Sequence, residues 1–331
     1  MSLRRSVAAA ALATISMAAA AWGSPWVIKP GEFYSELSGS VYSANTFYNE
    51  DGNRIWLGGK LDERVVRSVN EFGWKKRVSV WIGVPFVSRG FTPPGPKGAT
   101  FTSTGLGDLD FGLRFALHRG NSPMALSLGW TTPTGGNRRL YPGVSGEGGL
   151  DPSHVPSLPA SNRADTSLFF DAGLQSLSAA LELGGAAGRR AYWTLGGAYR
   201  YRFLEFGQSD EDSAGITTAF RHNAYMAGGQ AELGFWFRPQ LLVTGMFRGE
   251  WSISQSKLYD GDLLLDEKTK MMMVGPRFTY RVDDRMDVFG GSWHSIAGRH
   301  VLHHDQYYCG IAWKQTGLDR LAGALGGTKA R

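Results

Sequence analysis

A serine and a histidine two positions apart, Ser292 and His294, are the residues of this chain with the clearest capacity for chemistry. In an extended strand such residues point to the same face, so the hydroxyl could act as a nucleophile and the imidazole as its general base. No acidic or amide side chain that would orient the histidine can be identified from the sequence. An ordinary strand end can carry the same residues, so the sequence predicts no catalytic residue and a protein that is not an enzyme.

A second set of residues has the chemistry of a metal site. His300, His303 and His304 precede Asp305 in a stretch expected to be a loop, and imidazole and carboxylate ligands together suit transition metals. The sequence offers no second pair of ligands at the spacing typical of zinc sites. Whether these histidines bind a metal stays open, and no metal or other cofactor is predicted.

A third set of residues is charged and alternates with apolar residues. In residues 104–117, TGLGDLDFGLRFAL, every second residue from Leu109 onward is Leu or Phe, and Asp108, Asp110 and Arg114 fall between them. Successive side chains of a strand point to opposite faces, so one face is apolar and the other carries charge. A soluble sandwich can supply apolar surroundings on one side and water on the other, and so can a membrane barrel with a wet lumen.

The spacing of the strand-like stretches decides between these two folds. Short and long spacers alternate along the chain, as in bacterial outer-membrane barrels, which have tight turns at the periplasmic end, longer loops outside and an even strand number. The short spacers are residues 73–76, 119–122, 184–190, 238–240 and 282–285; the long ones are residues 44–60, 90–103, 135–165, 205–221, 253–268 and 298–303. We therefore predict an all-β fold, a transmembrane antiparallel β-barrel of about twelve strands over residues 24–316. In two stretches, residues 63–72 and 286–296, charged and apolar residues occur on both faces. We predict a strand in each, but not which of its residues face inward.

The N-terminus indicates export. Arg4 and Arg5 precede a small apolar run over residues 7–21, followed by a small-residue cleavage site, as in a secretory signal peptide. We expect residues 1–23 to be this peptide, residues 24–32 to be too short for a plug, and residues 317–331 to form a periplasmic tail. Beyond the signal no apolar run is long enough for a transmembrane helix, which excludes a helical bundle.

The composition narrows the function classes further. The net charge of +6 is small and scattered, which argues against a nucleic-acid partner. The single cysteine, Cys309, excludes an internal disulfide, so backbone pairing and packing must hold the fold together. The predicted location is the bacterial outer membrane, and the expected partners are outer-membrane lipid, a small-molecule solute, and the export and barrel-assembly machinery.

In such a barrel the charged face of each strand lines the lumen. The inward residues are predicted to be Asp108, Asp110, Arg114, Arg200, Arg202, Glu232, Arg248 and Glu250. These groups either fill the barrel with cross-strand ion pairs or line a constriction that selects solutes by charge. The loop over residues 135–165 is long enough to fold inward as a lid, with Arg138, Arg139, Tyr141, Glu147 and Asp151 as its candidate contacts.

Several passages resemble the outer-membrane family named after the MetA pathway of phenol degradation. They are Val84-Pro85-Phe86 at the end of a strand that follows a tight turn, the Thr-Gly-x-Gly-Asp opening at residues 104–108, Pro-Thr-Gly at residues 133–135, and residues 295–300, SIAGRH. The resemblance implies a porin-like barrel that moves small molecules, often aromatic or hydrophobic, across the outer membrane. The chain departs from the usual barrel ending at a terminal aromatic residue, because a tail follows the last strand.

The expected function is passive uptake of small molecules, including hydrophobic or aromatic ones, through an outer-membrane channel or transporter. One alternative is a closed barrel whose long outer loops act as a surface adhesion or binding module. A second is an outer-membrane lipid hydrolase that uses Ser292 and His294. Outer-membrane phospholipases place such a pair on the lipid-facing side, although there the histidine precedes the serine.

Overall fold

The computed structural model describes residues 25–49, 51–92, 100–132, 139–140, 168–169, 175–188, 190–202, 220–221, 225–253, 256–260, 263–267, 270–299 and 301–315. The predicted signal peptide and C-terminal tail lie outside these ranges and stay predictions. No helix in the described part of the chain is long and apolar enough to span a bilayer.

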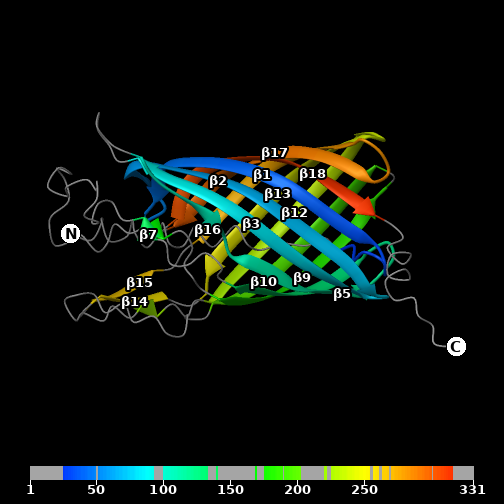
Figure 1. The fold of residues 1–331 in the computed structure, drawn as a ribbon, viewed down its shortest axis with the longest axis horizontal. Helices are drawn as coiled ribbons and strands as arrows, with labels where there is room; N and C mark the ends of the chain where they lie inside the picture. Colours follow the sequence, from blue (N-terminus) through cyan, green and yellow to red (C-terminus); the bar gives the residue numbers. More distant parts are fainter. Residues whose placement is uncertain are drawn as a thin grey trace.

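Thirteen strands form one antiparallel sheet that closes on itself into a barrel (Figure 1). They are β1 (Phe33–Tyr48), β2 (Arg54–Lys75), β3 (Val78–Thr92), β4 (Phe101–Leu106), β5 (Leu109–His118), β6 (Met124–Thr132), β9 (Ser176–Ala187), β10 (Ala191–Arg202), β12 (Tyr225–Arg238), β13 (Leu241–Ser252), β16 (Lys270–Arg281), β17 (Met286–Arg299) and β18 (Val301–Gln315). β4 and β5 pair with β3 one after the other and occupy the place of one strand. The barrel therefore has twelve strands around its circumference, which confirms the predicted fold.

Five further short strands lie in the connections. β7 (Arg139–Leu140) pairs with β8 (Leu168–Phe169), and β14 (Ser256–Asp260) pairs with both β11 (Phe220–Arg221) and β15 (Leu263–Glu267). The two small sheets they form belong to the long connections, which the sequence predicts as loops.

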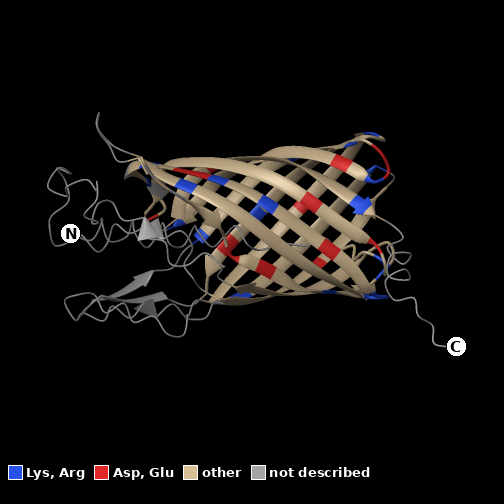
Figure 2. Ribbon diagram, viewed as in Figure 1, with Lys and Arg blue, Asp and Glu red and all other residues tan. Residues whose placement is uncertain are grey.

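The two faces of β5 show why the alternating pattern gives a barrel of this kind. Phe111 and Leu117 are 43% and 44% exposed on the outer surface, whereas Asp110 and Arg114 are 1% and 5% exposed and point inward. A closed sheet pairs its backbone groups internally, so the outer face can consist of apolar side chains in contact with lipid. Figure 2 shows the charged residues distributed along these strands rather than gathered at the two ends of the barrel.

The predicted sorting of the connections by length holds for the five short turns and for four of the six long loops. The five short turns join β2 to β3, β5 to β6, β9 to β10, β12 to β13 and β16 to β17, and they all lie at one end of the barrel, called here the short-turn end. The opposite end is called the long-loop end. Because antiparallel strands alternate in direction, every second connection returns to the same end.

Two of the six predicted long loops are wrong. β1 continues to Tyr48 and β2 already begins at Arg54, within the predicted loop 44–60, and a single residue separates β17 from β18 where residues 298–303 are predicted to form a loop. The reason is a small apolar core at the long-loop end. There Ala44, Leu57, Leu61 and Leu302 bury one another and hold β1, β2 and β18 together beyond the predicted strand ends.

Candidate functional site

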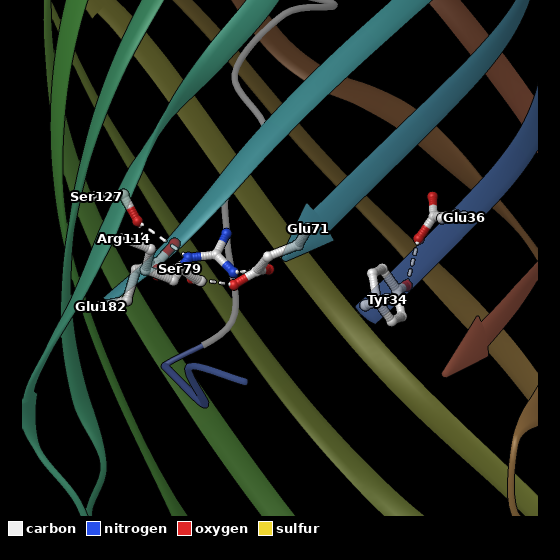
Figure 3. Close-up of polar contacts among 7 residues, drawn as sticks. All are labelled: Tyr34, Glu36, Glu71, Ser79, Arg114, Ser127 and Glu182. Carbon is white, nitrogen blue, oxygen red and sulfur yellow. Dashed lines mark hydrogen bonds and ion pairs between the residues drawn. The ribbon is translucent and has the colours of Figure 1, made fainter. Parts of the chain in front are cut away.

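A network of buried polar side chains extends over the inner surface of β2, β3, β5, β6 and β9 (Figure 3). At its centre the Arg114 guanidinium donates to a Glu71 carboxylate oxygen at 2.5 Å and to Ser127 Oγ at 3.2 Å, with a Glu182 oxygen 3.8 Å away. The Ser79 hydroxyl donates to the second Glu71 oxygen. We call these five residues the arginine network. Their side chains fix one another in place, because each carboxylate is held by a charge or a hydroxyl on another strand.

A second ion pair lies beside this network. Arg67 on β2 donates to Asp110 Oδ2 at 2.9 Å, and the Thr131 hydroxyl donates to Asp110 Oδ1 at 2.8 Å. Asp110 is four residues before Arg114 on the same face of β5. The two clusters therefore run along one wall of the lumen, with positive and negative groups in alternation.

The facing half of the barrel, from β10 to β18, has a different character. The Arg277 guanidinium lies over the Phe289 ring at 4.3 Å, and the Phe289 and Tyr308 ring centroids are 6.4 Å apart. The Tyr192 hydroxyl is 3.5 Å from a Glu232 carboxylate oxygen. We call Tyr192, Glu232, Arg277, Phe289 and Tyr308 the aromatic wall. It offers ring faces and a cation over a ring, a surface suited to flat or aromatic molecules.

A cavity of about 40 Å³ lies between the two halves of the barrel. Its lining includes Trp81, Asp110 and Ser127 from one half and Arg200, Met226 and Glu250 from the other. A volume of this size holds a few water molecules.

The N-terminal segment, residues 25–32, crosses the lumen at the short-turn end. Gly31 and Glu32 exchange backbone hydrogen bonds with Gly73 on β2, each 2.9 Å long. From there the chain reaches the far wall, where Pro25 is fully buried against Gly184 on β9 and the Trp26 ring packs edge-on against Tyr192 at 6.0 Å. The segment is predicted to be too short for a plug, and its described residues form no helix or strand, but an extended chain of a few residues is long enough to span the lumen.

Gly73 permits this crossing. A Cβ atom at position 73 would lie 1.9 Å from the carbonyl oxygen of Lys29, so no larger residue fits without displacing the segment. The contact at the far wall is also too close for a side chain, because a Cβ at Gly184 would lie 2.6 Å from the Pro25 ring. Glycines at both walls thus make room for the chain that passes between them.

The predicted lumen residues occupy the following places. Asp110, Arg114, Arg200 and Glu250 are buried, Asp108, Glu232 and Arg248 are half-buried, and Arg248 donates to Glu250 at 2.7 Å. Arg202 ends β10, and its side chain lies outside the described part. The same holds for the predicted lid residues Arg138, Tyr141, Glu147 and Asp151, whereas Arg139 begins β7.

Several interior residues are missing from the sequence-based set. Glu63, Arg67 and Glu71 lie four residues apart on the inner face of β2, and the buried Glu63 is paired with Arg89 on β3. Their common spacing of an even number of residues was the signal that could have identified them. The outward Arg64 and Asp62 interrupt the apolar face of the same strand, so the alternation alone does not give the register there. No sequence pattern identifies Arg277 and Tyr308, because each belongs to the aromatic wall through its contact with Phe289, which lies on the strand between them.

The predicted histidine cluster is divided between the two faces of β18. His304 points inward, where it is 8% exposed and its ring lies tilted against that of Tyr42, with the ring centroids 4.6 Å apart. His303 points away from it, with Nδ1 3.2 Å from the Thr46 hydroxyl, and His300 lies outside the described residues. Within the described ranges no three His, Cys, Asp or Glu side chains are grouped as metal ligands.

Comparison with known proteins supports the fold. No family model matches the chain, and no curated protein matches it. Among solved structures, the crystal structure of an outer-membrane channel from Pseudomonas putida F1 superposes with a TM-score of 0.64 at 12% sequence identity, covering 88% of this chain and 98% of that one. At such low identity the similarity establishes a barrel of the outer-membrane type.

More distant similarities are of the same architectural kind. The transport unit of the autotransporter AIDA-I from Escherichia coli has a TM-score of 0.49 at 10% identity and covers 94% of this chain and 99% of its own. The monoaromatic hydrocarbon channel CymD has a TM-score of 0.42 at 9% identity, with 88% and 89% covered.

Proposed function

We propose that this protein is a narrow outer-membrane channel for the passive uptake of small molecules and that its main role is not enzymatic. The observation that carries the proposal is the contrast between two parts of the lumen wall: the arginine network lies on β2, β3, β5, β6 and β9, and the aromatic wall lies on β10, β12, β16, β17 and β18. The barrel architecture is shared with the Pseudomonas putida channel, which supports the same reading.

The solutes that fit this lumen best are small molecules with an aromatic or other flat apolar part. The Phe289 and Tyr308 rings offer the apolar contact, and the Arg277 guanidinium beside them attracts an anionic substituent. The resemblance to the outer-membrane family of the MetA pathway of phenol degradation implies the same solute class. In this proposal the signal peptide at residues 1–23 directs export, and the short-turn end faces the periplasm.

The first experiment measures permeability directly. Purified protein in planar bilayers is expected to give discrete single-channel currents, and proteoliposomes are expected to swell in small solutes. Folding is checked beforehand by the shift in electrophoretic mobility on heating. Folded protein that passes neither ions nor small solutes would contradict the channel and favour the adhesion or binding module.

A second experiment tests the solute class with two matched anions. Benzoate and cyclohexanecarboxylate carry the same charge on rings of similar size, but only benzoate is aromatic. We expect benzoate to permeate faster, and Phe289→Leu to remove the difference while leaving chloride conductance within about twofold. Equal permeation of the two anions through the native protein would contradict an aromatic preference and leave the channel itself intact.

A further inference from the structure

Ser292 and His294 have a third partner that the sequence does not reveal. The Ser292 Oγ is 2.9 Å from His294 Nε2, and His294 Nδ1 is 3.0 Å from Asp305 Oδ1. The register of β17 and β18 places His294 directly opposite Asp305. A carboxylate accepts hydrogen bonds, so Nδ1 carries the proton and Nε2 is left free to accept the serine proton. This is the order nucleophile, base and orienting acid that activates a serine.

The three side chains lie on the outer surface of the barrel. On β17, Val288 and Ile296 are 39% and 51% exposed and in phase with Ser292 and His294, whereas Trp293 between them packs inward against buried Met271 and Met273. On β18, Tyr307 and Ile311 are exposed on the same face as Asp305. The triad is therefore separated from the lumen by the sheet and faces the membrane.

Its depth in the membrane can be judged from the neighbouring strands. Asp305 lies opposite Ser43 on β1, and Ser43 lies opposite Asp62 on β2, whose carboxylate forms an ion pair with Lys60 at 3.0 Å. Exposed charges mark the boundary between hydrocarbon and headgroups, because charge on the lipid face is unfavourable at greater depth. Asp305 is the fifth residue of β18, which begins at the long-loop end, so the triad lies in that half of the barrel and in register with an exposed ion pair. We place it near the level of the ester bonds of membrane lipids.

We propose that Ser292, His294 and Asp305 form a hydrolytic site for the carboxylic esters of membrane lipids. Ser292 Oγ bonds to the ester carbonyl carbon while its proton moves to His294 Nε2. The tetrahedral intermediate then breaks the bond to the alcohol oxygen, which leaves with the proton from Nε2. Water, losing a proton to the same nitrogen, attacks the acyl-serine, and fatty acid is released as Ser292 regains its proton. Ser292 and His294 are the catalytic residues, and Asp305 is a positioning residue.

Tyr307 controls access to this site. It lies opposite Ser292 in the strand register, its ring meets the His294 ring edge-on at 6.2 Å, and it is 56% exposed, while Ser292 itself is 8% exposed. Because Ser292 is buried beside an exposed Tyr307, we expect an acyl chain to approach it along the His294 and Tyr307 rings. The substitution Tyr307→Ala, which removes the ring, is expected to make Ser292 react faster.

The test uses the full-length protein in detergent micelles and in vesicles. A long-chain alkyl fluorophosphonate is expected to label Ser292, as located by peptide mass spectrometry, and Tyr307→Ala is expected to label faster. Fatty acid release is measured from phosphatidylethanolamine and, separately, from lipid A, to identify which lipid supplies the ester. Ser292→Ala and His294→Ala are each expected to reduce release at least about 100-fold, while channel currents stay unchanged.

Two further variants distinguish catalysis from a structural role. Ser68 lies on the same outer face but is hydrogen-bonded to Asn70, so Ser68→Ala is the matched control and is expected to retain full activity. Asp305→Asn is expected to lower the rate and to change its pH profile, because the orienting charge is lost. Folded native protein that neither labels at Ser292 nor releases fatty acid would overturn the proposal, as would labelling that His294→Ala leaves unchanged.

Discussion

Arg114 and Glu71 form a 2.5 Å ion pair that bridges a whole strand, since β3 lies between β5, which carries the arginine, and β2, which carries the glutamate. Both side chains are less than one-tenth exposed. The pair therefore ties together three strands of the lumen wall from the inside. The backbone ladder does not provide this connection, because it links only direct neighbours.

Removal of the arginine is expected to affect both stability and conduction. Arg114→Ala leaves the Glu71 and Glu182 carboxylates without their cation, and breaking such a buried pair costs about 3 kcal/mol. Urea unfolding in lipid vesicles measures the loss. In the same variant the current should become more cation-selective, and Arg114→Lys should restore most of the selectivity but not the hydrogen bond to Ser127. Unchanged reversal potentials in Arg114→Ala would show that ions do not pass this network.

Removal of the Asp110 charge is expected to change the ion selectivity in the opposite direction to removal of the Arg114 charge. Asp110→Asn removes the negative charge that Arg67 contacts at 2.9 Å while keeping the size of the side chain. Arg67 and Arg200 then leave this part of the lumen more positive, so anion selectivity should rise. Reversal potentials under a salt gradient measure the change. Asp62→Asn, on the outer face of β2, is the control and should leave selectivity unaltered.

The N-terminal segment is expected to limit the current. Trp26→Ala removes the ring that packs against Tyr192 at 6.0 Å and should loosen the segment from the far wall. We expect the single-channel conductance to rise severalfold, or brief closures to become rarer. Trp56→Ala, an exposed tryptophan at the long-loop end, serves as the control. Identical conductance in the native protein and Trp26→Ala would show that the segment does not lie in the ion path.

The contacts of Glu32 predict a dependence of stability on pH. Burial raises the pKa of Glu32. The hydrogen bond from the Lys29 backbone N–H and the Lys314 ammonium, 3.2 Å away, together lower the pKa by more than burial raises it, so it lies below the usual 4.5. A carboxylate with a depressed pKa in the folded state contributes stability above its unfolded pKa and loses it as the pH falls through the folded one.

Glu32→Gln should therefore lower the unfolding midpoint at neutral pH and have no effect at a pH well below 4.5. Because Lys314 is largely exposed, the difference should be at most about 1 kcal/mol. Melting of the two proteins is followed across the pH range. A difference that persists unchanged into strong acid would contradict a role for the Glu32 charge.

The strand pattern could be predicted from the sequence, but the contacts across strands could not. The alternation around Asp110 and Arg114 follows from the two-residue period of a strand, which needs no knowledge of the partner strands. The partner of His294 depends on the register of β17 against β18. The sequence placed Asp305 next to a loop, so the acid that orients the histidine could not be identified.

Strand ends were predicted less well for a related reason. Ala44 and Leu57 are neighbours only after β1 and β2 have paired, and the polar residues between them resemble a loop when considered alone. The path of residues 25–32 also depends on tertiary structure, because Gly73 and Gly184 become the two ends of a single passage only in the closed barrel.

The burial of Pro25 has a consequence for every protein made with an addition at this end. Pro25 packs inside the barrel beside Gly184, and Trp26 packs against Tyr192, so a fusion made directly at this end starts at the contacts that hold the segment to the far wall. An affinity tag fused there is expected to disturb these contacts and, with them, the current through the lumen. Insertion in the turn between β12 and β13, at exposed Pro239 and Gln240, leaves the passage untouched and labels the short-turn end.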